Sequence, residues 1–273
     1  MSSGHSLATA LDDLRSLDAL AVRDTPLARR DPRAKLVTTA LFIVTVVSFD
    51  RYSVAALLPL ALYPTVLAVQ AELPWRTLWR ALWLASPLVL MIGLFNPLLD
   101  RAPLLVLAGA EISAGWISLA AIMLRFGLTL GALLATVAGT GMRPLCAALG
   151  RFGVPRVFTV QLLFLHRYLL VLAAEAVRLD TARALRAGDR RRMGLAVYAS
   201  LLGHLLLRAF ARAQRIHQAM LARGFDGELR LINPWRWQPA DTLFLCGWCG
   251  FFVAARVLDL PATIGLLLSG AAP

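Results

Sequence analysis

Two arginines of this chain are followed by small residues at points where a helical pattern stops. A guanidinium carries five donors in a fixed fork that suits carboxylates and backbone carbonyls, and small neighbours let another surface approach closely. A glycine after the arginine ends a helix because glycine adopts positive φ without strain. We therefore expect one arginine at each of two helix tips. The motifs are Arg186-Ala187-Gly188 and Ala222-Arg223-Gly224.

Each of these arginines could instead satisfy the last carbonyl groups of its own helix, with help from the helix dipole. Other chemistry is not indicated. The sequence contains no phosphate loop, no Gly-x-Ser-x-Gly and no His-Glu-x-x-His motif. No two of the four histidines stand three or four residues apart, as metal ligands on a helix would. We expect no catalytic residue, metal site or cofactor on the chain itself.

The composition indicates that helices in a membrane must position these arginines. Of the 273 residues 59% are apolar and 16% are charged, and the mean hydropathy is +0.68. Soluble domains have roughly half apolar and about a quarter charged residues. The net charge is +12. In a membrane protein we expect this excess of basic residues in cytoplasmic loops. Nucleic-acid binding is not favoured, because the many apolar residues leave little soluble domain to carry it.

Basic residues before the first apolar run place the N-terminal segment, 1–35, in the cytoplasm. Residues 36–140 then form a four-span transmembrane region. Arg125 lies inside the fourth span, where a charge is costly, so its side chain should face protein or reach the membrane surface. The four apolar runs that we interpret as spans are 36–49, 52–69, 81–99 and 116–140.

Residues 141–238 have a different character, with many arginines and no stretch of about 20 residues free of charge. The patterns over 156–186 and 193–223 predict long amphipathic helices in the cytoplasm. Residues 239–273 contain the last span, 242–257, so five spans put the C-terminus outside. The amphipathic helices could also cross, which gives a range of five to seven. The predicted fold is an all-α membrane protein.

The sequence resembles the transmembrane T component of energy-coupling factor transporters, specifically the cobalt-type CbiQ family. The resemblance covers nearly the whole chain. In that family two Ala-Arg-Gly motifs end long cytoplasmic helices. The second is intact at Arg223, whereas the first departs from the pattern around Arg186, and Arg183 is a competing assignment. The segments that carry the resemblance are Asp31-Pro-Arg-Ala-Lys35, Phe95-Asn-Pro-Leu-Leu-Asp100 and Ala222-Arg223-Gly224.

The resemblance implies a non-catalytic coupling subunit of an ATP-driven cobalt importer in the cell inner membrane. Each arginine motif would dock into a groove of one of two ATPase subunits. Their closure would move the coupling helices and tilt a separate metal-binding membrane subunit, beside a small accessory membrane subunit. Two alternatives stay open: the same role in a nickel or vitamin importer, and a membrane-embedded enzyme. The enzyme would need paired carboxylates or histidines within the spans.

Overall fold

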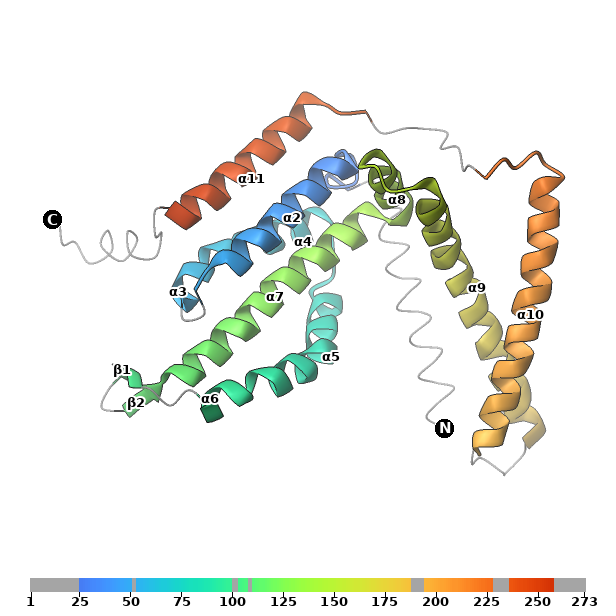
Figure 1. Cartoon of the computed structure of the whole chain (residues 1–273), viewed down its shortest axis with the longest axis horizontal. Helices are drawn as coiled ribbons and strands as arrows, with labels where there is room; N and C mark the ends of the chain where they lie inside the picture. Colours follow the sequence, from blue (N-terminus) through green and yellow to red (C-terminus); the bar gives the residue numbers. More distant parts are fainter. Residues whose placement is uncertain are drawn as a thin grey trace. The chain divides into compact units, whose positions relative to one another are not determined.

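The computed structural model describes residues 25–50, 53–99, 103–107, 110–187, 194–227 and 236–257. The chain divides into two compact units (Figure 1). Of the described residues, those within 25–141 and 236–257 form the scaffold unit, and those within 142–227 form the coupling unit. Long apolar helices dominate both units, so the chain is an all-α membrane protein, as the sequence predicted.

The scaffold unit contains most of the helices and one small hairpin. Asp31 caps the first helix by accepting a hydrogen bond from the backbone N–H of Arg33, and Pro32 occupies the first helical position, where its missing N–H costs nothing. The elements are α2 (Pro32–Ser48), α3 (Val54–Leu57), η1 (Pro59–Ala61), α4 (Leu62–Gln70), α5 (Trp75–Gly93), α6 (Phe95–Leu99), β1 (Pro103–Leu107), β2 (Ala110–Ser113), α7 (Ala114–Thr140) and α11 (Pro239–Val257).

Three of these elements differ from the sequence prediction. The second span is divided among α3, η1 and α4, because Pro59 and Pro64 remove helical donors. The third begins at Trp75, six residues earlier than the predicted 81. The predicted external loop forms an antiparallel hairpin of β1 and β2. Trp79 and Trp83 of α5 are 61% and 74% exposed, which suits contact with lipid or a partner.

An aromatic cluster joins three helices of the scaffold unit. The ring of Tyr63 on α4 packs 4.6 Å from Phe42 on α2 and 4.8 Å from Trp248 on α11. The Tyr63 hydroxyl lies 2.8 Å from Thr39 Oγ1, which in turn lies 2.8 Å from Thr136 Oγ1 on α7. Chain segments far apart in the sequence therefore meet in one packed core.

Side-chain contacts fix the helix directions in this unit. The N-terminal ends of α2 and α11 meet at Asp31 and Asp241, and their C-terminal ends meet at Ser48 and Arg256. These two helices are therefore parallel. Helix α7 is antiparallel to α2, because its residue Thr136 lies near Thr39 while its residue Arg125 reaches Phe49. If α2 and α11 start on the same side of a membrane, an even number of crossings precedes α11.

Four described helices are long and apolar enough to cross a membrane. They include the first long helix of the coupling unit, which the sequence assigned to the cytoplasm with a crossing as the alternative. The three others, α5, α7 and α11, fall in segments that the sequence predicts as spans. The four helices span Trp75–Pro97, Gly115–Thr140, Arg156–Arg186 and Pro239–Val257.

The coupling unit contains α8 (Met142–Arg151), α9 (Arg156–Ala187) and α10 (Leu195–Leu221). The two long helices expected from the arginine-rich patterns are confirmed as α9 and α10, within two residues at each end. Gly153, at φ 89°, makes the turn between α8 and α9 in a conformation that favours glycine.

Candidate functional site

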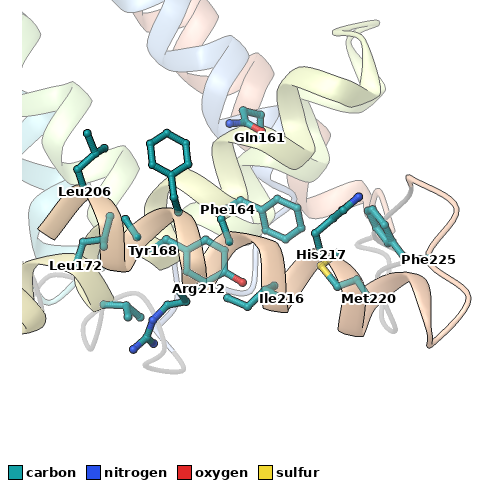
Figure 2. Close-up of a pocket in the computed structure, with 14 residues that line it drawn as sticks. Gln161, Phe164, Tyr168, Leu172, Leu206, Arg212, Ile216, His217, Met220 and Phe225 are labelled. Carbon is teal, nitrogen blue, oxygen red and sulfur yellow. The ribbon is translucent and has the colours of Figure 1, made fainter. Parts of the chain in front are cut away.

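The C-terminus of α10 forms a complete Schellman motif around the Ala222-Arg223-Gly224 segment. Gly224 has a φ of 78°. Its N–H donates to Leu221 O at 3.0 Å, and the N–H of Phe225 donates to Met220 O at 3.0 Å. This is the pattern in which a left-handed glycine satisfies the last carbonyl groups of a helix. Figure 2 shows Phe225 and Met220 near each other at this end of α10.

The motif leaves the side chain of Arg223 exposed at the helix tip. Within the described part of the chain its guanidinium makes no hydrogen bond or ion pair. The backbone caps α10 by itself, so the alternative in which this arginine satisfies its own helix is not what the structure shows. A Cβ placed on Gly224 would meet no atom within 4 Å. Glycine is therefore required at this position for its positive φ and not for lack of space, and no other part of the described chain covers the surface beside it.

The first motif lies at the C-terminus of α9. Arg186 is in the last turn, exposed, and without a side-chain partner among the described residues. Ala187 is the last helical residue, and Gly188 lies outside the described residues. The competing residue, Arg183, donates from Nε and NH2 to Asp180 Oδ1 at 3.1 and 3.0 Å. Only Arg186 of these two resembles Arg223 in its surroundings.

Helices α9 and α10 form an antiparallel pair, because only the seven residues 188–194 connect them and residues distant in sequence meet. Arg208 NH1 of α10 donates to Glu175 Oε1 of α9 at 2.5 Å, and Arg178 lies 3.7 Å from the same carboxylate. The tips with Arg186 and Arg223 are thus at opposite ends of the pair. The 27 residues of α10 separate them by roughly 40 Å.

A largely apolar groove of about 480 Å³ lies between α9 and α10 (Figure 2). Its polar groups are Gln161, Tyr168, Arg212 and His217, and it extends to Met220 and Phe225 beside the capped tip. The packing between the two helices is therefore incomplete.

A polar cluster in the scaffold unit could not be recognised from the sequence, because it joins residues 210 positions apart. This Asp31–Asp241 cluster comprises Asp31, Arg33, Lys35 and Asp241. Asp241 Oδ1 accepts from the backbone N–H of Asp31 at 3.0 Å, and its Oδ2 accepts from that of Gln238 at 2.9 Å. Arg33 forms a salt bridge with Asp31 at 2.9 Å. The only sign of this cluster in the sequence is an aspartate close to a proline at the start of each helix, Asp31 beside Pro32 and Asp241 after Pro239.

Lys35 is the most constrained member of the Asp31–Asp241 cluster. Its side chain is buried, and its Nζ donates to Leu27 O at 3.0 Å. Burial lowers the pKa of Lys35 to about 8, although the charges of Asp31 and Asp241 act in the opposite direction. The residue precedes the apolar run 36–49, at the end of the unit that the sequence places in the cytoplasm.

Two arginines converge at the other end of α2. Arg125 of α7 donates from NH2 to the carbonyl oxygens of Phe49, at 3.0 Å, and of Asp50. Arg256 of α11 lies 3.4 Å from Ser48 O and stacks over the Phe49 ring at 4.9 Å. Arg125 thus faces protein, as expected, and both arginines place positive charge at a helix C-terminus.

Within the described ranges no three His, Cys, Asp or Glu side chains gather as metal ligands would. The backbone N–H of Asp31 donates to the Asp241 carboxylate, and the carboxylates of both residues are engaged with backbone N–H groups at a helix start. This arrangement holds helices and does not resemble a catalytic pair.

Comparison with known proteins gives one consistent result. The cobalt transport protein family CbiQ matches residues 23–233. A Cobalt transport protein CbiQ from Rhodobacter capsulatus is 34% identical over 90 residues, which are 33% of this chain and 37% of that relative. One from Salmonella typhimurium is 30% identical over 168 residues, which are 57% of this chain and 75% of the relative. The first match thus spans just over a third of that relative.

Proposed function

Since the chain belongs to the CbiQ family of cobalt transport proteins, we propose that it is the non-catalytic coupling subunit of an ATP-driven cobalt importer in the cell inner membrane. Its role is to transmit the conformational change of ATPase subunits to a separate metal-binding membrane subunit, with a small accessory membrane subunit alongside. Cobalt is favoured over nickel or a vitamin because both relatives carry cobalt transport in their names.

The exposed guanidinium of Arg223 is the observation that carries this proposal. An arginine with five donors and no partner in the described residues is suited to carboxylates or carbonyls of another protein. The Schellman motif fixes the backbone on which it stands. Docking therefore requires little ordering of the α10 tip, and less ordering leaves more of the interaction energy for binding.

The separation of the two tips supports a pair of ATPase subunits. Arg186 and Arg223 end different helices at opposite ends of the α9–α10 pair, and two tips roughly 40 Å apart cannot enter one groove of a single small surface. Each tip then needs its own partner. Movement of the two ATPase subunits toward each other would act on both ends of the helix pair at once.

Arg186 is the first docking arginine in this proposal. Arg183 already donates two hydrogen bonds to Asp180, so it would lose that ion pair on engaging a partner. Arg186, with Ala187 and Gly188 after it, has no such contact to lose among the described residues.

Charge reversal of the two arginines tests the proposal. Arg223→Glu should abolish cobalt uptake and release the ATPase subunits on purification, and Arg186→Glu should do the same at the other tip. Interface arginines of this kind typically cost at least about 2 kcal/mol when truncated, and a carboxylate adds repulsion. Uptake by whole cells and co-purification of ATPase subunits are the measurements.

The matched control is Arg215→Glu, which makes the same charge change on an exposed position of α10 two turns before the tip. It should leave uptake and ATPase retention near normal, because solvated charges contribute little. Arg183→Ala should be milder than Arg186→Glu. Normal uptake and normal ATPase retention in Arg223→Glu would show that this tip does not dock.

A further inference from the structure

The groove between α9 and α10 leaves large apolar side chains uncovered in the coupling unit. Leu206 and Phe210, which line it from α10, are 57% and 60% exposed. The lining continues along α10 to Met220, and on α9 it runs from Gln161 to Leu172 (Figure 2). The wall that α10 provides is therefore about 21 Å long. An apolar groove of this length is the kind of surface that receives an amphipathic helix.

The α10 wall of the groove is also basic. Helix α10 contains three arginines and no acidic residue. Arg208 is paired with Glu175 of α9. Arg212, in contrast, lines the groove, is exposed, and makes no hydrogen bond or ion pair within the described part of the chain. The groove therefore suits a segment that has an apolar face and carries acidic residues.

The amino-acid sequence that precedes the described residues has this composition. Leucines recur at spacings of four, three and three residues, which predicts a helix with one apolar face. A helix over residues 7–20 would be about 20 Å long, close to the length of the α10 wall. Three aspartates and one arginine give residues 1–22 a side-chain charge of −2, whereas the whole chain carries +12. The leucines are Leu7, Leu11, Leu14 and Leu17, and the aspartates are Asp12, Asp13 and Asp18.

This segment and the coupling unit continue from neighbouring points of the scaffold unit. Leu27 is buried against Gly139, on which an added Cβ would lie 2.7 Å from Leu27 Cδ2. Three residues after Gly139 the chain enters α8, whose ten residues span about 15 Å before the turn to α9. Residues 21–26, fully extended, can cover about 20 Å. The connection is therefore long enough for residues 7–20 to approach α9 and α10.

We propose that residues 7–20 form an amphipathic helix that docks in the α9–α10 groove of the same chain. Its leucines would cover Leu206 and Phe210, and its aspartates would lie beside Arg212. The family match begins at residue 23, so the proposed helix lies outside the matched region. Because the segment is tethered, its effective concentration is high and weak contacts are sufficient. The inference does not depend on ATPase docking, because neither Arg186 nor Arg223 lines the groove.

The test places the photo-crosslinking amino acid p-benzoylphenylalanine at position 14 of the full chain in nanodiscs. After irradiation, mass spectrometry of the digested chain should locate crosslinks within 161–172 and 206–220. The same amino acid at position 16 is the control, because residues two apart on a helix do not share a face. It should give few crosslinks to these peptides. Crosslinks from position 14 to lipid or to scaffold helices in place of α9 and α10 would overturn the proposal.

A mixture of nitrogen-15-labelled and unlabelled chains determines whether the contact is within one chain. Crosslinked peptides should carry a single label, and peptides of mixed label would mean that the groove binds the segment of a second copy and the proposal is wrong.

Substitutions identify the contacts that hold the segment. Leu7→Asp/Leu11→Asp should lower the crosslink yield from position 14 at least about tenfold, since exposing one buried leucine already costs about that factor. Arg212→Glu should lower the yield about threefold, as expected for an exposed ion pair. Arg215→Glu makes the same change at an exposed position of α10 that does not line the groove, and should leave the yield unchanged. Equal losses in the two arginine variants, or an unchanged yield in the leucine variant, would contradict docking in this groove.

Discussion

The start of α2 and the tip of α10 both gather charged residues at a helix end, but they use them differently. In the Asp31–Asp241 cluster both carboxylates are engaged, and Lys35 donates to a carbonyl in the interior. At the α10 tip Arg223 makes no polar contact with the described residues. Satisfied buried charges connect helices of one chain, whereas an arginine left at an open surface is available to another chain.

The packing also differs between the two units. The scaffold unit has an aromatic cluster that joins α2, α4 and α11, with ring centres 4.6 to 5.4 Å apart about Phe42 and Phe252. The α9–α10 pair is joined by the Glu175–Arg208 ion pair and retains a groove of about 480 Å³. The packing therefore favours a fixed arrangement of helices in the scaffold unit. In the coupling unit the groove allows α9 and α10 to move relative to each other.

Removing Asp241 should produce the largest change. Asp241→Ala leaves two backbone donors and nearby cations without their partner, and breaking one side of a buried charged group costs about 3–5 kcal/mol. The comparison variant is Asp180→Ala on α9, which removes an i,i+3 contact with Arg183 and should cost about 0.5 kcal/mol or less. Denaturation of the purified chain in micelles measures both. If both variants lost a similar amount of unfolding free energy, the charged groups of the scaffold unit would not be more important for stability than those of the coupling unit.

The buried amine of Lys35 should make stability depend on pH. Its pKa is about 8 in the folded chain against the ordinary 10.5. Between these values the unfolded chain binds the proton and the folded chain does not, so the free energy of unfolding rises with pH, by up to roughly 3 kcal/mol. Below pH 8 both states are protonated and the contribution is constant.

Lys35→Met is the matched variant for this dependence, because it keeps the length of the side chain and removes the titrating group. The difference between the wild type and the variant across this window isolates Lys35 from other groups. A wild-type curve that is flat or falls relative to the variant between pH 8 and 10.5 would show that Lys35 keeps its proton when folded.

Arg125 should contribute less than either of these residues. Arg125→Met removes the donor to the Phe49 and Asp50 carbonyls, which costs about 1–2 kcal/mol for hydrogen bonds from a charged group. Arg215→Met, on the exposed surface of α10, should change the unfolding free energy little. Equal unfolding midpoints for the two variants would mean that the α2 terminus is stabilised by Arg256 alone.

The smallest effect on stability is expected at Glu175. Arg208 has 60% of its side chain exposed, so Glu175→Gln should cost no more than about 1 kcal/mol. Because this pair joins α9 to α10, the variant should still increase amide hydrogen exchange within α10 relative to Asp180→Asn. Unchanged exchange would show that the ion pair does not hold the two helices together.

The sequence was sufficient to predict α9 and α10, because their periodic apolar residues and terminal glycine are local signals. It also identified the Arg223 tip, whose capping depends on Gly224 alone. The sequence offered both Arg186 and Arg183 for the first tip, and the contact of Arg183 with Asp180, which favours Arg186, is visible only in the structure. That Arg186 and Arg223 dock an ATPase stays a prediction.

What the sequence could not predict depends on contacts between distant segments. Asp31 and Asp241 are 210 residues apart, and neither is unusual in its own surroundings. The carbonyl partners of Arg125 are 75 and 76 residues away. The hairpin β1–β2 depends on the pairing of two short segments, whereas the breaks in the second span coincide with Pro59 and Pro64 and could have been predicted from these prolines.

The distance between Asp31 and Asp241 has a consequence for how the chain is made. At about 5–20 residues per second, a ribosome completes Asp241 about 10–40 s after Asp31. During that time α2 has entered the membrane with Lys35 and Asp31 near its start, and the last helix is absent. The nascent protein therefore exposes an incomplete polar surface until α11 has been made. A chain truncated before residue 241 keeps these polar groups without their partner. Proteases that degrade incomplete membrane proteins could recognise the truncated chain by this exposed polar surface.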